Sequence, residues 1–167
     1  MRNLTGKLEA GANVAIIVVA LLLGTVVVKR FLLPQPTNPG LAAIQPGTQL
    51  SLPGVDWKQN DKTLLMVLST SCHFCTESAP FYQRLAQKHG GVRLVAVMPQ
   101  TADESRKYLD EHGVTVDEIR QAVPSTIGVS GTPTLIVVDR NGAVVKSWVG
   151  KLPPETETEV MNQLSAS

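Results

Sequence analysis

A run of seven residues without a charge, 63–69, leads directly into the only two cysteines of this chain. An apolar run of this length is typical of a central strand that is covered on both faces. The motif Cys72-His73-Phe74-Cys75 follows three residues after its end. If the pair opens a helix, both sulfurs lie on one face, because residues three apart on a helix are neighbours. The sequence therefore predicts a buried strand that leads into a helix with two cysteines at its start.

The spacing of the cysteines favours redox chemistry over metal binding. A helix N-terminus carries a partial positive charge and free N–H groups, which favour a thiolate, the attacking species in disulfide exchange. A structural zinc site would need two more ligands, such as a second cysteine pair or a spaced pair of histidines. The chain has no second cysteine pair, and His73, His89 and His112 do not have the required spacing. We interpret Cys72 and Cys75 as a redox pair and predict no metal and no cofactor.

The composition of the chain argues against nucleic acid as a binding partner and against a set of structural disulfides. Only 17% of the residues are charged, the net charge is +1, and basic residues do not cluster with aromatic ones. Nucleic-acid binding is therefore not expected. Because both cysteines belong to one motif, the chain has no framework of structural disulfides, and a catalytic pair is the better interpretation.

The N-terminal third predicts a membrane anchor. Residues 10–28 are apolar except for Asn13 and Thr25, and a helix of that length, at about 1.5 Å per residue, spans close to the ~30 Å of a bilayer core. A cleaved signal peptide is the alternative, but three valines, a lysine and an arginine (residues 26–30) stand where a small-x-small cleavage site would be needed. We predict an N-terminal cytoplasmic tail over 1–9, a transmembrane anchor over 10–33, a Pro/Gly-rich linker over 34–53, and a folded domain over 54–167.

The orientation of this anchor follows mainly from the chemistry of the cysteines. Basic residues flank both ends of the apolar run, so the positive-inside rule hardly separates the two orientations. A disulfide-forming pair suits an oxidising compartment. We therefore expect a single-pass protein of the cell membrane with its catalytic domain on the extracytoplasmic, periplasmic side.

Strands and helices alternate through the domain. The order is βαβα followed by ββα, which predicts an α/β sheet with helices on both sides. Residues 48–52 also alternate as a short first strand would, and an Asn-Gly turn at 140–142 predicts a hairpin. After the first buried strand, the expected elements are a helix over 72–89, a strand over 92–98, a helix over 102–112, strands over 134–138 and 143–149, and a helix over 154–164.

Two prolines connect this pattern to a known family. Pro80 stands five residues after Cys75, where it would kink the helix, and Pro133 lies in Gly-Thr-Pro-Thr just before a strand. With the cysteine motif, these residues resemble the thioredoxin superfamily, and within it the membrane-anchored TlpA/ResA-type thiol-disulfide oxidoreductases. The resemblance covers roughly residues 47–164. It implies a thioredoxin-like fold, a central mixed sheet with helices on both faces, preceded here by one transmembrane helix.

The resemblance also implies roles for the site residues. Cys72 would be the exposed nucleophile and Cys75 the shielded resolving thiol. Pro133 would form a cis peptide bond and present the backbone of Thr132 to a bound substrate chain as an added strand. The partners would be protein dithiol or disulfide substrates and an unidentified redox partner.

Three further residues are expected to tune the pair: His73, Phe74 and Pro80. A protonated His73 beside the nucleophile would favour the thiolate and make the disulfide more oxidising. Phe74 would contribute to an apolar docking surface. The chain departs from the family in two ways: Ser71 stands where a tryptophan is frequent, and the strand over 64–68 has no acidic residue where thioredoxins carry a buried carboxylate.

Two other functions remain open at this stage. A peroxiredoxin-like peroxidase would fit Ser69, three residues before the first cysteine, but Leu65 occupies the position where that motif has proline. A copper-binding maturation factor would use the two thiolates, which are soft ligands suited to Cu(I), with His73 as the nearest third ligand.

Overall fold

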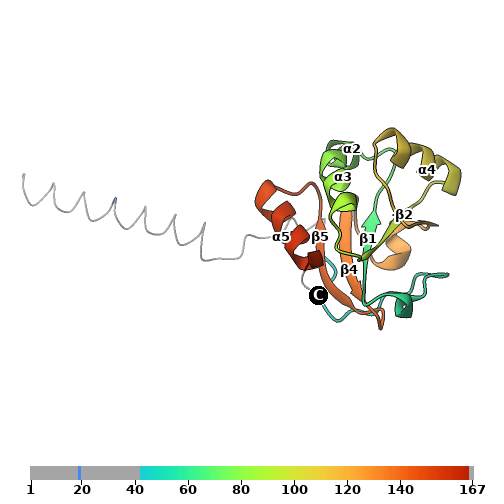
Figure 1. Ribbon diagram of the computed structural model, residues 1–167, viewed down its shortest axis with the longest axis vertical. Helices are drawn as coiled ribbons and strands as arrows, with labels where there is room; N and C mark the ends of the chain where they lie inside the picture. The colour runs from blue at the N-terminus through green and yellow to red at the C-terminus, as the bar shows by residue number, and fades with distance from the viewer. Residues whose placement is uncertain (1–18, 20–41, 166–167) are drawn as a thin grey trace, which may run out of the picture. The chain divides into compact units, whose positions relative to one another are not determined.

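A computed structural model describes residue 19 and residues 42–165. Within that part the chain forms a five-stranded sheet in the order β3-β2-β1-β4-β5 (Figure 1). The strands are β1 (Lys62–Val67), β2 (Arg93–Met98), β3 (Glu118–Gln121), β4 (Thr134–Asp139) and β5 (Val144–Val149). The helices are α2 (His73–Glu77), α3 (Ala79–Gln87), α4 (Ala102–Glu111) and α5 (Pro154–Ser165), with the 3-10 helices η1 (Trp57–Gln59) and η2 (Pro124–Ile127).

The sheet is mixed, as predicted. β1 lies at its centre, parallel to β2 and antiparallel to β4, so that Val67 pairs with both Val97 and Thr134. β3 extends the parallel half and β5 the antiparallel half. Because β1, β2 and β3 run in one direction, all three end where β4 begins. We call this the C-terminal end of the sheet, and it is where the loop to Cys72 emerges.

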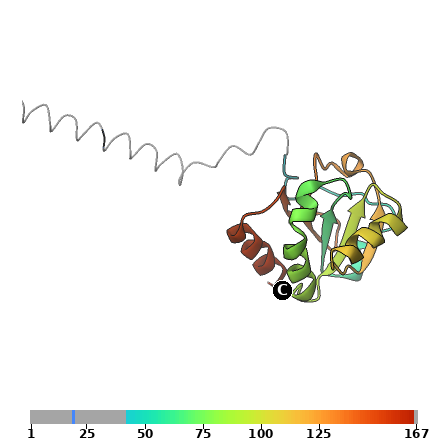
Figure 2. The same ribbon diagram turned by 90° about the horizontal axis from the view of Figure 1, so that it is seen from above.

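The two faces of the sheet are covered differently. The side chains of Leu64 and Met66 point into a core with α3, α4 and α5, whereas those of Leu65 and Val67 point into a second core on the other face. Figure 2 shows α5, α3 and α4 as red, green and yellow ribbons along the sheet. The second core is closed by residues of η2, by the aromatic side chain of Trp57 in η1 and by the segment before it.

This arrangement corrects the expectation of α-helices on both faces. In the described part, the three longer helices share one face, and the other face has only 3-10 helices. The strand order explains why. The connection from β1 to β2 through α2 and α3 and the connection from β2 to β3 through α4 both lead toward the β3 edge of the sheet. Connections between parallel strands are right-handed, so two connections that lead toward the same edge place their helices on the same face.

The stretch predicted as a linker is partly packed against the domain. Leu50 and Leu52 are buried in the second core. The N–H of Gly47 donates to the carbonyl of Val144 at 2.8 Å, and the N–H of Val144 donates to the carbonyl of Thr48 at 2.9 Å. The prediction of a hydrogen-bond-poor linker up to residue 53 is therefore wrong for this part of the segment. Its apolar side chains supply cover that the second face would otherwise lack.

The predicted tail and anchor, 1–9 and 10–33, lie outside the described residues apart from Val19. None of the helices in the described ranges, 19 and 42–165, has the length and apolar character needed to cross a bilayer.

Candidate active site

The cysteine pair opens a helix, as predicted. Cys72 is the N-cap of α2, with extended backbone angles of φ −90° and ψ 107°, and the N–H of Cys75 donates to its sulfur at 3.1 Å. The N–H of Cys72 in turn donates to the carbonyl of Ser69 at 3.1 Å. A tight turn therefore connects the end of β1 to the start of α2. The two sulfurs form a disulfide across Cα atoms 5.2 Å apart.

The two sulfurs differ in exposure. Cys72 is half-buried, whereas Cys75 is 1% exposed and belongs to the core beneath α3. An incoming thiolate or disulfide can therefore reach Cys72 and not Cys75. The Cys75 N–H also gives the Cys72 sulfur a hydrogen bond of the kind that stabilises a thiolate.

One expected helix is in fact two. The sequence predicts one helix over 72–89 with a kink at Pro80, but α2 ends at Glu77 and α3 begins at Ala79. Pro80 causes the break, because it has no N–H to donate to the preceding turn and its ring crowds the carbonyl four residues before it. Pro80 therefore orients α2, which carries the cysteines, separately from α3, whose Phe81 and Leu85 are buried in the core.

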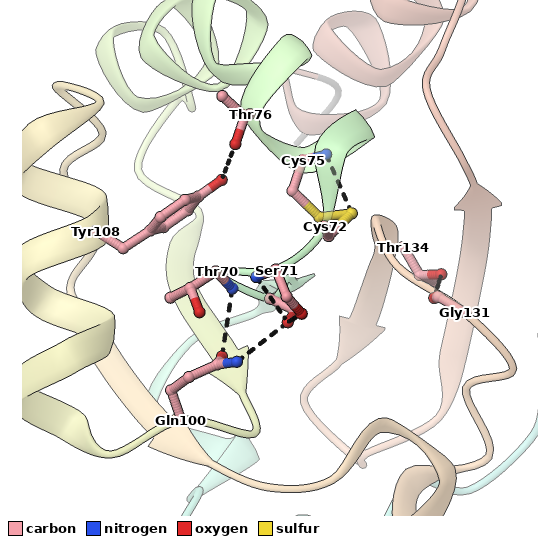
Figure 3. Close-up of a disulfide and its surroundings, with 10 residues drawn as sticks. Thr70, Ser71, Cys72, Cys75, Thr76, Gln100, Tyr108, Gly131 and Thr134 are labelled. Atoms are coloured by element: carbon pink, nitrogen blue, oxygen red, sulfur yellow. Dashed lines mark hydrogen bonds between the residues drawn. A yellow bond between two sulfur atoms is a disulfide. The ribbon is translucent and has the colours of Figure 1, made fainter.

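A polar network supports the loop before Cys72 (Figure 3). The Gln100 side chain donates from Nε2 to the Ser69 hydroxyl at 3.1 Å and accepts the N–H of Thr70 at 3.4 Å. Ser69 and Ser71 share a hydrogen bond between their hydroxyl oxygens at 3.0 Å. The loop after β2 thus anchors the loop after β1. Sequence reasoning missed Gln100; the only hint was that two neighbouring parallel strands must end side by side.

His73 is turned toward an acidic neighbour. Its Nε2 lies 3.0 Å from Oε1 of Glu77, one helical turn later, and its side chain is 79% exposed. The other carboxylate oxygen of Glu77 accepts from Nζ of Lys151 at 2.8 Å. The Lys151 ammonium, and to a lesser degree His73, hold the pKa of Glu77 below its usual value. The role of His73 in tuning the cysteines stays a prediction.

The loop before β4 lies at the same end of the sheet. The Thr132–Pro133 peptide bond is cis, as expected from the sequence. Pro133 is buried and its carbonyl accepts the N–H of Gly150 at 2.7 Å, while the Thr134 hydroxyl donates to the carbonyl of Gly131 at 2.7 Å. In Figure 3, Gly131 and Thr134 are drawn to the right of the disulfide, and Tyr108 to its left. Within the described part, the half-buried Thr132 makes no backbone hydrogen bond.

The expected apolar docking surface is only half formed. Phe74 is 54% exposed beside the cysteines, so it is available to a substrate. Pro133 is buried and adds little exposed surface. Of the two side chains predicted to flank the sulfurs, Phe74 therefore carries most of the accessible apolar area.

The buried polar residues of the described part carry hydroxyl groups, and none carries a carboxylate. The buried polar residues in the described ranges are Thr63, Ser69, Ser78, Ser105 and Thr134, none of them acidic. Beside Cys75, the hydroxyl of Thr76 shares a hydrogen bond with that of Tyr108 at 3.2 Å (Figure 3). Burial raises the pKa of Tyr82, also in this core, well above its usual value. The core that encloses Cys75 therefore contains the hydroxyls of Tyr82 and Tyr108 but no buried acidic group among the described residues.

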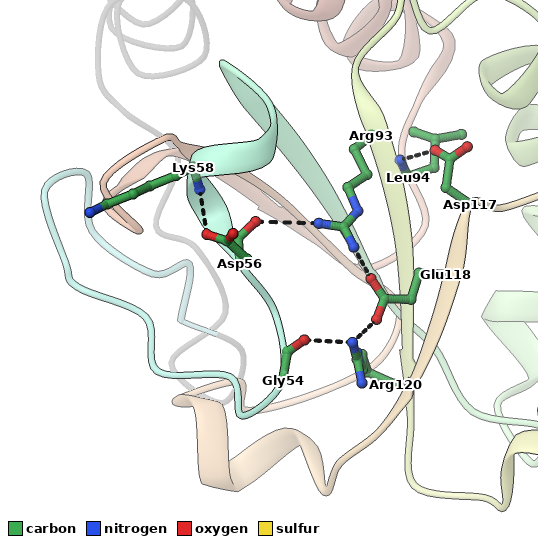
Figure 4. Close-up of polar contacts among 8 residues, drawn as sticks. All are labelled: Gly54, Asp56, Lys58, Arg93, Leu94, Asp117, Glu118 and Arg120. Carbon is green, nitrogen blue, oxygen red and sulfur yellow. Dashed lines mark hydrogen bonds and ion pairs between the residues drawn. The ribbon is translucent and has the colours of Figure 1, made fainter.

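A second charged cluster serves the fold and not the cysteines (Figure 4). Glu118 of β3 pairs with Arg93 of β2 and with Arg120. The two arginines also donate to backbone carbonyls of the segment before β1: Arg93 to that of Asp56 at 3.3 Å and Arg120 to that of Gly54 at 2.5 Å. The cluster therefore ties the edge strand β3 to the rest of the domain.

In the described ranges, histidine, cysteine and acidic side chains nowhere gather in a group of three or more that could hold a metal ion. The residues predicted for the site are nevertheless brought together. The two cysteines, His73 and Phe74 share one turn of helix, and β4 begins next to the end of β1.

A disulfide between a helix N-cap and the first turn, beside a cis-proline loop on a sheet of this order, is the arrangement of thioredoxin-like oxidoreductases, and this chain is one. Several solved structures share the fold. One, described as the thiol:disulfide interchange protein DsbE from Chlorobium tepidum, has a TM-score of 0.59 and 24% identity over 74% of this chain and 97% of that one. The thioredoxin domain of a thiol-disulfide oxidoreductase from Bacteroides vulgatus has a TM-score of 0.56 and 16% identity, covering 73% and 99%.

A thiol-disulfide isomerase from Corynebacterium glutamicum is similar too, with a TM-score of 0.54 and 14% identity over 78% of this chain and 98% of that one. At these identities the structures support the fold. The family comes from the sequence itself: the Redoxin family model matches residues 27–164, and the chain belongs to the Redoxin family.

Proposed function

We propose that this chain is a membrane-anchored, extracytoplasmic thiol-disulfide oxidoreductase that exchanges disulfides with protein substrates through Cys72 and Cys75. The observation that carries the proposal is the unequal exposure of the two sulfurs. Cys72 is accessible and accepts a hydrogen bond at the start of a helix, whereas Cys75 is 1% exposed. One thiol can therefore meet a substrate, and the other is placed to react only with the first.

The exchange proceeds in two steps. The Cys72 thiolate attacks one sulfur of a substrate disulfide, forms a mixed disulfide and releases the other substrate sulfur as a thiolate. The Cys75 thiolate then attacks the Cys72 sulfur, closes the disulfide seen here and releases the second substrate sulfur. Two thiols are oxidised and one substrate disulfide is reduced to two thiols. Run backwards, the same steps oxidise a substrate dithiol, and the reduction potential of the pair relative to its compartment decides the direction.

The loop before β4 supplies a place for the substrate backbone. Thr132 is half-buried, and within the described part its backbone N–H and C=O make no backbone hydrogen bond. An extended substrate chain could therefore pair with it as an added strand. The exposed ring of Phe74 would contact an apolar side chain next to the substrate cysteine.

The proposed location is supported by the apolar run over 10–28 and by the oxidising compartment that suits a disulfide-forming pair. A thiol-disulfide isomerase from Corynebacterium glutamicum with the same fold, at a TM-score of 0.54, is described as secreted. Fractionation of cells should recover the chain with membranes, and protease added outside spheroplasts should digest the domain. Recovery in the soluble cytoplasmic fraction would contradict this part of the proposal.

The roles of the cysteines are tested with two matched variants. Cys75→Ala should accumulate mixed disulfides with substrate proteins, visible as thiol-sensitive bands on non-reducing gels, because the resolving thiol is missing. Cys72→Ala should form none and should be inactive in insulin reduction. A Cys72→Ala variant that traps substrates or keeps full activity would refute the assignment. Rapid consumption of hydrogen peroxide without a protein disulfide substrate would indicate a peroxidase instead.

A further inference from the structure

Ser78 is a buried polar residue that the scheme above does not use. Its side chain is 5% exposed, and its hydroxyl oxygen is enclosed without a hydrogen-bond partner among the described residues. Buried hydroxyls are almost always paired, and an unpaired one destabilises the fold. In the disulfide form of the protein, a hydroxyl three residues after Cys75 is therefore available to form a new hydrogen bond.

The backbone brings Ser78 next to the buried sulfur. Although α2 ends at Glu77, Ser78 keeps right-handed helical angles of φ −87° and ψ −3°, and its N–H donates to the carbonyl of Phe74 at 3.1 Å. Residues three apart in such a path are neighbours, and their side chains lean toward the helix N-terminus. The Ser78 hydroxyl thus lies one turn after Cys75, on the same buried face.

A third residue continues this face. Cys75, Ser78 and Tyr82 form one buried stripe across the junction of α2 and α3: they are 1%, 5% and 3% exposed, and the N–H of Tyr82 donates to the carbonyl of Ser78 at 3.2 Å. Ser78 acts on the Tyr82 hydroxyl by lowering its pKa, against the larger rise that burial causes. The two hydroxyls are therefore close, yet the Ser78 oxygen is not engaged in a hydrogen bond of good geometry within the described part.

Reduction of the disulfide leaves a buried Cys75 thiol, whose ionised form the Ser78 hydroxyl can stabilise. When the disulfide opens, Cys75 becomes a thiol inside the core, and it must ionise to attack the mixed disulfide on Cys72. Burial disfavours a thiolate. The buried polar groups of the described ranges include no carboxylate that could take up the proton. A hydroxyl that donates a hydrogen bond to the sulfur would stabilise the ionised form without any change in its own charge.

Resting on the function proposed above, we infer that Ser78 Oγ donates a hydrogen bond to Cys75 Sγ once the disulfide opens, and so promotes the resolving step. In that step the Cys75 thiolate forms a bond to the Cys72 sulfur, the bond from Cys72 to the substrate sulfur breaks, and the substrate leaves as a thiolate. The proton lost from Cys75 passes to water or to the departing thiolate. Ser78 keeps its own proton, with Tyr82 as the next hydroxyl along the stripe.

The test compares Ser78→Ala with Ser105→Ala, a buried serine of α4 that is 0% exposed and donates to the carbonyl of Gln100 at 3.4 Å. With Ser78→Ala, resolution of a preformed mixed disulfide should be about tenfold slower at neutral pH, the usual effect of one charge-assisted hydrogen bond. The two rates should converge at alkaline pH, where Cys75 is ionised in both proteins. Equilibration with glutathione at alkaline pH, where the reduced Cys75 is ionised, should show the disulfide favoured about tenfold more, which is about 30 mV.

Melting temperatures of the oxidised and reduced proteins distinguish a hydrogen bond from Ser78 to Cys75 from a role of Ser78 in packing alone. Ser78→Ala should leave the melting temperature of the oxidised protein unchanged or higher, because the lost oxygen makes no hydrogen bond of good geometry there, and should lower that of the reduced protein. Ser105→Ala should lower both alike. Resolution rates and glutathione equilibria within twofold of the parent protein would overturn the inference. If Cys75→Ala also failed to trap substrates, the proposed function itself would be wrong; trapping with an unaffected Ser78→Ala variant would refute only the role of Ser78.

Discussion

Replacing Gln100 with alanine tests whether the polar network behind the cysteines positions them. The side chain makes two hydrogen bonds to the loop after β1, one to the Ser69 hydroxyl at 3.1 Å and one from the Thr70 N–H at 3.4 Å. The first is partly buried and contributes about 1 kcal/mol net. The second is long and exposed, so water can replace it, and its loss costs only a few tenths of a kcal/mol.

The remaining partners limit the damage. The Ser69 hydroxyl keeps its hydrogen bond to Ser71 at 3.0 Å, so it is not left unpaired. Gln100→Ala should therefore lower the free energy of unfolding by about 1–1.5 kcal/mol, or the melting temperature by about 3–8 °C for a domain of this size. If the loss of loop anchoring is felt fully in the exchange step, insulin reduction should slow by up to about tenfold.

A second glutamine, Gln121, provides the matched control for Gln100→Ala. Gln121 also donates one long hydrogen bond, at 3.4 Å, to the carbonyl of Pro99 on the exposed surface, and Gln121→Ala should change neither stability nor rate appreciably. A double-mutant cycle with Ser69→Ala should give a coupling energy of about 1 kcal/mol in urea unfolding. A coupling energy below about 0.3 kcal/mol, or equal effects of the two glutamine variants, would show that the network does not hold the loop.

Other substitutions test the surrounding fold. Glu118→Ala leaves two partly buried guanidinium groups without their carboxylate and should cost about 2–3 kcal/mol in urea unfolding, whereas Glu159→Ala, which breaks one half-exposed pair with a lysine, should cost less than about 1 kcal/mol. Because Lys151 lowers the pKa of Glu77, the ionised carboxylate stabilises the fold above pH 4.5 and loses this effect as the pH falls through the lowered value; the melting temperatures of Glu77→Gln and the parent protein should converge in acid. Gly142→Ala forces a side chain into a backbone with φ +83° and within 2.9 Å of an aromatic ring, and should cost about 1–3 kcal/mol; an unchanged melting temperature would contradict this.

The strongly patterned elements could be predicted from the sequence. The charge-free run over 63–69 and the apolar run after Arg93 became β1 and β2, because a short apolar run of this length fits a strand that is covered on both faces. Asn141-Gly142 marked the hairpin between β4 and β5 correctly, with Gly142 at φ +83°. The site followed from these strands, since both the cysteine motif and the cis-proline loop adjoin their ends.

What was missed depends on contacts distant in sequence. The strand β3 reads Glu-Ile-Arg-Gln and has no apolar alternation, and its ion pairs with Arg93 exist only once β2 lies beside it. Gln100 and Ser78 have no local signal either, because the first acts across neighbouring loops and the second is unusual only through its burial. The helix break at Pro80 was foreseen as a kink, and the local geometry turned it into a full separation.

The segment at residues 44–50 has a consequence for which other chains the protein can accept. By pairing with Val144, it occupies part of the outer edge of β5, and the opposite edge of the sheet is formed by the short, charged β3. Open sheet edges recruit extended chains indiscriminately, and a protein that handles cysteine-bearing clients meets such chains constantly. Strand addition at these margins is thereby disfavoured, which fits the proposal that substrate chains pair with Thr132 instead. A shortened chain beginning at residue 54 would lose this protection together with Leu50 and Leu52 of the core, and would be prone to aggregate with its own clients.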